Sequence, residues 1–233
     1  MHVVVCATPS IVLYFAREHK GHEGIKGTTV EDYQHILTHD HDRTFYNYGG
    51  AHQECLEHVS RYLKDSMENE PGLGWNRRMG ELIQEMIHFW KNLDPEDSRD
   101  PDQIFPDKVN AFEAKYDEIL DLAKKEYEYE PPGKYYREGF NLSIRLSAYK
   151  DSHLLFLHDR RVAPTNNLAE RLLRVYKRKQ QQVMTFRSSP CFTYLCQSLG
   201  VIASLRAQEQ NLYQSVSSIF DRPEHRHVSQ IFS

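Results

Sequence analysis

Two short stretches of the sequence hold carboxylates whose placement could support metal chemistry. The first is THDHD, Thr38 to Asp42, which follows a short apolar run. Along a strand, alternation would place Asp40 and Asp42 on one face and the two histidines on the other. A carboxylate at the end of a buried strand is a natural ligand for Mg²⁺ or Mn²⁺, which favour oxygen. Asp40 is therefore a candidate metal ligand, although the same residues also fit a polar turn.

The second stretch is RVAPTNNLAERLLR, Arg161 to Arg174. Glu170 stands three residues after Asn167, which is the spacing of a capping box at a helix start. Glu170 also precedes Arg174 by four residues, so a surface ion pair is available. A helix start holds a side chain rigidly, so capping and metal binding are compatible. Glu170 is the second candidate metal ligand.

A third motif, CLEH, gives Cys55 and His58 a Cys-x-x-His spacing on a predicted helix. Both side chains could reach one zinc ion, but a structural zinc site needs four ligands. Cys191 and Cys196 could supply two more, at a spacing that is not a standard zinc signature. A small buried cysteine beside a hydrogen-bonded histidine is the simpler interpretation.

Charge is distributed unevenly along the chain. The net charge of −4 argues against indiscriminate binding to nucleic acid. Between Arg160 and Arg187, however, eight basic residues accompany one acidic residue, whereas 94–130 holds thirteen acidic and five basic residues. The basic segment suits a phosphate backbone, and a solvated helix face would explain it equally well. The candidate DNA-binding residues are Arg171, Arg174, Lys177, Arg178, Lys179 and Arg187.

The apolar pattern predicts strands first and helices afterwards. Two β-branched runs, HVVVCATP and SIVLYFA, predict a hairpin, and the apolar pair before THDHD predicts another strand. Helical periodicity follows, which indicates a mixed α/β or α+β fold with a large helical portion. The predicted helices cover 51–67, 80–93, 109–120, 141–157, the segment from Asn167, 191–208 and 212–220.

Length and composition set outer limits. A chain of 233 residues is long enough for one large domain or two small ones. Four cysteines at irregular spacing do not form a recognisable disulfide framework, so we expect a reduced, cytoplasmic protein. No apolar run approaches the ~18–20 residues that a membrane span needs, so we expect no membrane association.

Four segments, in order along the chain, resemble the DDE transposases of the insertion sequence 66 type: HILTHDHDRTFYNY, HQECLEHVSRYLKD, FEAKYDEIL and RVAPTNNLAERLLRVYKRKQQ. The resemblance runs from about residue 2 to 220. The Asn-Asn-Leu-Ala-Glu-Arg block is highly specific, and the Cys-x-x-His helix is moderately so. The resemblance to these transposases implies an α/β fold with a truncated RNase H-like core of few N-terminal strands, a large helical insertion and C-terminal helices. The implied division is 1–50 for the partial strand region, 51–160 for the insertion, 161–220 for the catalytic-Glu helix and C-terminal helices, and 221–233 for a tail.

The resemblance also implies a function. Asp40 corresponds to the second catalytic carboxylate and Glu170, 130 residues later, to the third. The implied reaction is two-metal DNA cleavage and strand transfer with Mg²⁺ or Mn²⁺, on transposon ends and in the company of other transposase copies. Family members carry the first catalytic Asp on a strand just upstream of the one that starts here at His2, and no other carboxylate is placed to replace it. We therefore expect the C-terminal part of a transposase, inactive alone.

Two other functions fit some of these features. A non-catalytic fragment would bind DNA, or full-length transposase, without cutting. An HD-type phosphohydrolase would use the pairs His39-Asp40 and His158-Asp159 as metal ligands. Those enzymes carry the pair on helices, whereas the first pair here follows a predicted strand, which disfavours this assignment.

Overall fold

The computed structural model describes residues 2–129, 138–183 and 188–220. The chain divides into two compact units: the terminal unit, residues 1–33 with 167–233, and the central unit, residues 34–166. Each unit combines one small two-stranded sheet with several helices. The predicted mixed α/β class is therefore confirmed. The four-part division of the chain stays a prediction, and Arg187 and the predicted tail 221–233 lie outside the described residues.

The sheet of the terminal unit is an antiparallel hairpin of β1 (His2–Ala7) and β2 (Val12–Arg17), in which Val5 lies opposite Tyr14. The predicted hairpin is confirmed. A short helix, α1 (His22–Ile25), follows and contacts β1. The strands are rich in β-branched and aromatic side chains, which pack well on a pleated surface.

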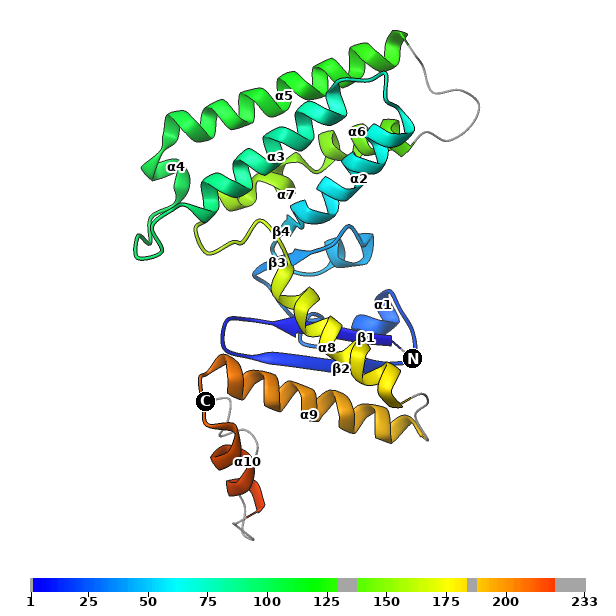
Figure 1. The fold of residues 1–233 in the computed structure, drawn as a ribbon, viewed down its shortest axis with the longest axis vertical. Coiled ribbons are helices and arrows are strands. Elements are labelled where there is room, and N and C mark those ends of the chain that lie inside the picture. Colours follow the sequence, from blue (N-terminus) through cyan, green and yellow to red (C-terminus); the bar gives the residue numbers. More distant parts are fainter. Residues whose placement is uncertain (1, 130–137, 184–187, 221–233) are drawn as a thin grey trace. The chain divides into compact units, whose positions relative to one another are not determined.

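Three helices complete the terminal unit: α8 (Asn167–Val183), α9 (Ser189–Ala207) and α10 (Leu212–Phe220). Helix α9 packs along β2, and α8 contacts β1 (Figure 1). Burial raises the pKa of Tyr14 to about 12 and that of Cys196 to about 11, so both groups are neutral in this core at physiological pH. The buried apolar core consists of Val12, Tyr14, Tyr176, Phe192 and Cys196.

Close approach of α9 to β2 depends on two small residues of the helix. A Cβ added at Gly200 would lie 3.1 Å from the Val12 carbonyl oxygen. One turn later, the Ser204 hydroxyl accepts a hydrogen bond from the Val12 N–H (2.9 Å) and donates one to the Val12 carbonyl (3.1 Å). The side chain of Ser204 is fully buried, so these bonds satisfy backbone groups that water does not reach.

The sheet of the central unit is a parallel pair, β3 (Ile36–His39) and β4 (Ala51–Glu54), with His39 opposite Glu54. The predicted strand before THDHD is confirmed, but the helix predicted from residue 51 is wrong over its first residues. Gly49 has φ 78°, and a Cβ at Gly50 would lie 2.4 Å from the Gln34 carbonyl oxygen. These glycines let the chain turn back closely beside β3, so residues 51–54 pair as a strand before the helix begins at Leu56.

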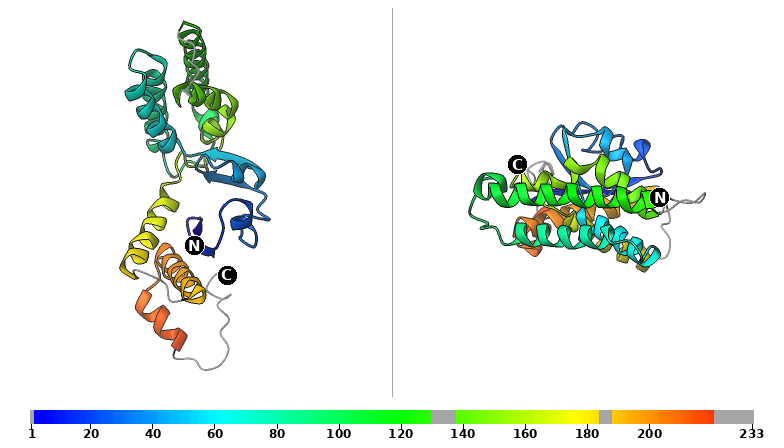
Figure 2. Two further views of the ribbon diagram at one scale, coloured as in Figure 1. Left: turned by 90° about the vertical axis from the view of Figure 1, so that its right-hand side faces the viewer. Right: turned by 90° about the horizontal axis from the view of Figure 1, so that it is seen from above.

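The helices of the central unit are α2 (Leu56–Asn69), α3 (Trp75–Lys91), α4 (Pro101–Ile104), α5 (Pro106–Tyr129), α6 (Glu138–Ala148) and α7 (Lys150–Leu154), with 3-10 turns at Arg43–Asn47 (η1) and Leu155–Leu157 (η2). Helices α3 and α5 run side by side, and α2 packs on α3 (Figures 1 and 2). Large side chains such as Trp75, Phe112 and Tyr116 fill the core between them and are almost completely buried.

The single helix predicted over 141–157 is interrupted. It breaks at Tyr149, between α6 and α7, and α7 gives way to η2 at Leu155. The buried amide of Gln53 on β4 accepts a hydrogen bond from the Phe156 N–H (2.9 Å) and donates one to the His153 carbonyl (3.2 Å). A strand side chain therefore supplies bonds that a continuous helix would make within itself.

Candidate metal centre and nucleic-acid interface

Asp40 is the first residue after β3 and is partly exposed. Within the described residues of the central unit, no hydrogen bond or ion pair engages its carboxylate. The alternation predicted through Asp42 stops at His39, because Asp42 instead accepts a hydrogen bond from the Thr44 N–H (2.9 Å) and begins η1. A half-buried carboxylate without a protein partner keeps both oxygens available for a hard cation. The donor chemistry of Asp40 thus fits Mg²⁺ or Mn²⁺.

The two histidines that flank Asp40 are both tied to β4. Nε2 of His39 lies 3.1 Å from Nδ1 of His52, and Nδ1 of His41 lies 2.8 Å from a carboxylate oxygen of Glu54. Nδ1 of His39 also donates a short hydrogen bond to the carbonyl of Asp40. Because a carbonyl only accepts, this nitrogen carries the proton, and Nε2 accepts from His52. Burial lowers the pKa of His39, which favours this neutral form.

Glu54, at the end of β4, is a completely buried carboxylate. It accepts hydrogen bonds from His41, from the Tyr46 hydroxyl (2.8 Å) and from the Arg145 guanidinium (2.7 Å). Nε2 of His153 lies 3.5 Å from the same carboxylate, which is too long for a strong hydrogen bond. We call these five residues the Glu54 cluster.

The cluster keeps Glu54 ionised. Burial by itself raises the pKa of this carboxyl, but the imidazoles of His153 and His41 and the charge of Arg145 outweigh burial and hold the pKa well below its usual range. Burial conversely lowers the pKa of His153. The cluster joins β4 to η1, α6 and α7, so it connects the end of the small sheet to the surrounding helices.

Sequence reasoning did not single out Glu54. Its partners His41, Tyr46 and Arg145 lie 13, 8 and 91 residues away along the sequence, and no local pattern reveals such pairs. Its neighbour Cys55 was noticed only for the Cys-x-x-His spacing. A weak signal was available in the polar run before that motif, since buried polar residues in a strand require partners elsewhere.

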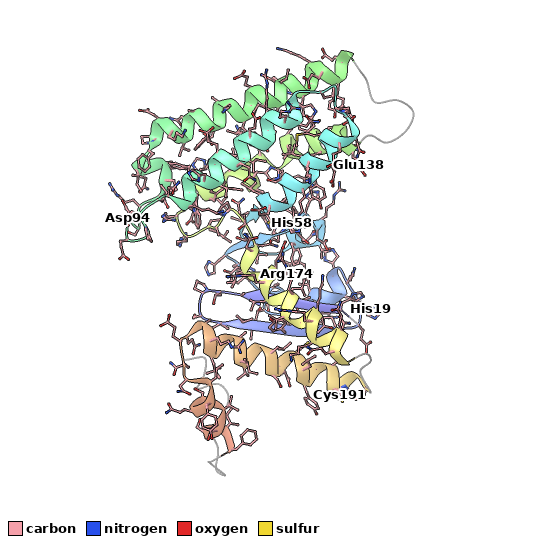
Figure 3. All side chains as sticks on the ribbon, viewed as in Figure 1. His19, His58, Asp94, Glu138, Arg174 and Cys191 are labelled. Atoms are coloured by element: carbon pink, nitrogen blue, oxygen red, sulfur yellow. The ribbon has the colours of Figure 1, made fainter. Side chains whose placement is uncertain are left out.

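Cys55 is completely buried immediately before α2, and its sulfur lies 3.4 Å from the Asn166 backbone N–H. His58 lies in the first turn of α2 and is partly buried (Figure 3). In the terminal unit, Cys196 belongs to the apolar core, and the exposed Cys191 accepts a hydrogen bond from the Ser188 hydroxyl. All four cysteines are free thiols. Within the described part of the central unit, a ligand atom of Cys55 and one of His58 lie within 4.8 Å of each other, which is two of the four ligands that a structural zinc site needs.

Glu170 lies in the first turn of α8, where a negative charge interacts favourably with the helix dipole. Nη2 of Arg174 lies 3.4 Å from one of its carboxylate oxygens, so the predicted pairing over four residues is confirmed. The bond is long, and the arginine is largely exposed. Such a pair contributes little to stability, about 0.3–0.5 kcal/mol. Capping by Asn167 stays a prediction.

Helix α8 is anchored by one face and leaves a basic face exposed. Leu172 packs against the hairpin core, and the Tyr14 hydroxyl donates to its carbonyl (2.8 Å). Arg174 lies on α8 (Figure 3) and has an acidic partner, whereas the other exposed cations of α8 have none among the described residues of the terminal unit. This exposed basic face consists of Arg171, Arg174, Lys177, Arg178 and Lys179.

Both residues of the second His-Asp pair, His158 and Asp159, form contacts with other side chains at the protein surface. Nδ1 of His158 lies 3.0 Å from Asp102, and Nε2 lies 2.9 Å from Glu113. Asp159 forms a bidentate pair with Arg161. The first pair follows strand β3, not a helix. Neither pair has the helical setting of an HD-type phosphohydrolase.

Residues 1–191 match the transposase IS66 family. The matched range includes β1 to β4, the helices of the central unit, all of α8 with its basic face and the first residues of α9. The chain therefore belongs to the IS66 family of transposases, and the relationship predicted from the four motifs is confirmed. No curated protein and no solved structure matches the chain. Among the described residues, no helix combines the length and apolar character needed to cross a bilayer.

Proposed function

We propose that this chain carries part of the catalytic centre of a DDE-type transposase, with Asp40 and Glu170 as ligands of the divalent ions. The observation that carries the proposal is the position of Asp40 directly after a strand in a member of this family, with a carboxylate that has no partner among the described residues of the central unit. Glu170, in the first turn of α8, is the second ligand. On this proposal the strands of the two small sheets belong to an RNase H-like core.

Both candidate ligands are carboxylates, which suit Mg²⁺ or Mn²⁺ better than softer ions. When bound, a pair of such ions activates the attacking hydroxyl and stabilises the leaving oxygen of a phosphodiester. The task of Asp40 and Glu170 is to hold and orient the ions. Oxygens that share one metal pair must lie roughly 3–8 Å apart, because metal–oxygen bonds are about 2.0–2.1 Å and the metals about 3.5–4 Å apart.

The exposed basic face of α8 is the proposed contact for the DNA backbone. It follows Glu170 on the same helix, so the cations and the proposed metal ligand share one rigid element. Phosphate contacts by lysine and arginine fix the register of DNA but do not read its sequence. DNA at transposon ends and further transposase copies are the proposed partners, in a reducing cytoplasm.

Metal binding tests the proposed ligands directly. Titration of the full chain with Mn²⁺, followed by electron paramagnetic resonance of the free ion, should show weaker binding after Asp40→Asn and after Glu170→Gln. The double variant should lose little more than either single variant, because both residues serve one site. Asp42→Asn is the matched control, since it removes a neighbouring carboxylate that already has a backbone partner. Unchanged Mn²⁺ affinity in both single variants would refute the assignment.

A second candidate is a non-catalytic fragment that binds DNA. Strands β1 and β2 contain no aspartate or glutamate, so these strands offer no third carboxylate, whereas the basic face of α8 is fully displayed. Parallel measurements of DNA binding by gel shift and of Mn²⁺ binding separate the two functions. DNA binding without Mn²⁺ binding that depends on Asp40 or Glu170 supports the non-catalytic fragment, whereas Mn²⁺ binding that both substitutions weaken supports the proposed metal ligands.

A further inference from the structure

The turn that carries Asp40 is held by its neighbours. The carboxylate of Asp40 makes no bond within the described central unit, yet the residues on either side are fixed to β4. His39 is buried and contacts His52, and His41 bonds to the buried carboxylate of Glu54. The backbone of Asp40 is thus anchored on both sides while its carboxylate stays available.

Glu54 is the fixed point of this arrangement. Its side chain is completely buried, and the Arg145 guanidinium of α6 binds its other oxygen at 2.7 Å. Arg145 itself stacks over the Tyr62 ring of α2, 4.7 Å from the ring centroid. A buried carboxylate with bonds from several elements has one low-energy orientation, so it transmits that orientation to His41.

We infer that Glu54 is a positioning residue that sets the Asp40 carboxylate for metal binding, acting through its hydrogen bond to His41. The inference rests on the proposed role of Asp40. Both carboxylate oxygens of Glu54 already accept hydrogen bonds from protein side chains, so Glu54 is not itself a ligand in this scheme. Supporting residues of this kind typically change metal affinity by about 10–100-fold when they are removed.

Metal affinity is the first measurement. Glu54→Gln in the full chain should weaken Mn²⁺ binding roughly tenfold, while the melting profile stays cooperative. Glu70→Gln is the matched control. Glu70 is another carboxylate of the central unit, it stands at the C-terminal end of α2, and it accepts a hydrogen bond from the Tyr127 hydroxyl (2.8 Å). This control should leave Mn²⁺ affinity unchanged.

A double-mutant cycle tests the route through His41. His41→Ala removes the link but leaves Glu54 bonded to Arg145 and Tyr46, so it is the milder change, and by itself it should weaken Mn²⁺ binding about as much as Glu54→Gln. If Glu54 acts through His41, Glu54→Gln should have no further effect on Mn²⁺ affinity in the His41→Ala background. Tyr46→Phe removes a different hydrogen bond to the same carboxylate oxygen, and it should leave Mn²⁺ affinity unchanged.

Amide hydrogen exchange supplies a metal-free measurement of the turn. The Thr44 and Phe45 N–H groups, both bonded to Asp42, should exchange at least about tenfold faster in Glu54→Gln and His41→Ala than in Glu70→Gln. Unchanged exchange would overturn the inference. Faster exchange with unchanged Mn²⁺ affinity would also overturn it, provided that Asp40→Asn weakens binding. If Asp40→Asn has no effect on Mn²⁺, the proposed ligand fails instead, and the exchange rates alone decide whether Glu54 holds the turn.

Discussion

Removal of three cations from α8 should change how DNA binding responds to salt. Lys177, Arg178 and Lys179 are exposed and have no acidic partner among the described residues of the terminal unit. From Lys177 to Lys179 the helix axis advances only about 3 Å. Successive residues of a helix are turned by about 100°, so these three long side chains fan out around α8. We take one phosphate contact for each of them.

Each phosphate contact contributes about 0.9 to the slope of log affinity against log salt on duplex DNA, so replacing all three residues with Ala should flatten the slope by about 2.7 units. When salt rises from about 50 to about 200 mM, the unaltered chain and the variant both lose affinity for DNA. The loss for the unaltered chain should then be roughly 40-fold larger than the loss for the variant. Affinity should fall about equally for all DNA sequences, because phosphate contacts carry no base information.

Fluorescence anisotropy with two unrelated duplexes, over a range of salt concentrations, measures both effects. The control replaces three exposed lysines of the central unit, Lys64, Lys91 and Lys125, and so makes the same change in net charge. A slope that is unchanged in the α8 variant, or flattened equally in the control, would refute the phosphate contacts. The basic face would then be an ordinary solvated helix surface.

Three further outcomes are expected. The 233-residue chain alone should neither nick nor join DNA with Mg²⁺ or Mn²⁺, because β1 and β2 offer no third carboxylate; robust nicking that Glu170→Gln abolishes would contradict this. Burial opposes protonation of His158, but hydrogen bonds to its two carboxylate partners outweigh burial and raise the pKa of the imidazole. The stability that His158 contributes is therefore complete below its unfolded-state pKa and is lost as pH rises through its folded-state pKa. The difference in melting temperature between the unaltered chain and His158→Gln should accordingly shrink between about pH 6 and 8. Ser204→Ala should lower the free energy of unfolding by about 1–3 kcal/mol in denaturant titrations, since it leaves two buried backbone groups unpaired; the exposed Ser198→Ala should change it by less than about 0.5 kcal/mol.

The sequence by itself determined the local elements and the family. Alternating β-branched residues predicted the hairpin of β1 and β2. Periodic apolar residues predicted α9 and α10 close to their observed bounds, whereas the predicted ranges for α3 and α5 cover only part of longer helices. These predictions succeeded because the signals are local: the period of an apolar face depends only on neighbouring residues. The four motifs were sufficient for the family assignment because they recur in order.

Local sequence patterns did not predict strand β4. Residues 51–54 are polar and precede a strongly amphipathic helix, so their local pattern extended that helix. Their strand conformation comes from pairing with β3, which the close approach at Gly50 permits. The change from α7 to η2 has the same origin, because the bonds that shape it come from Gln53, about a hundred residues earlier.

The Glu54 cluster was decided by tertiary structure alone. A sequence shows that a glutamate is present, but its burial and ionisation depend on His41, Arg145 and Tyr46, which three different segments supply. The cost of burying a charge is met only when these donors converge in space. Asp40 could be singled out from its place after an apolar run, whereas the bonds that hold its turn became visible only when β3 and β4 were paired.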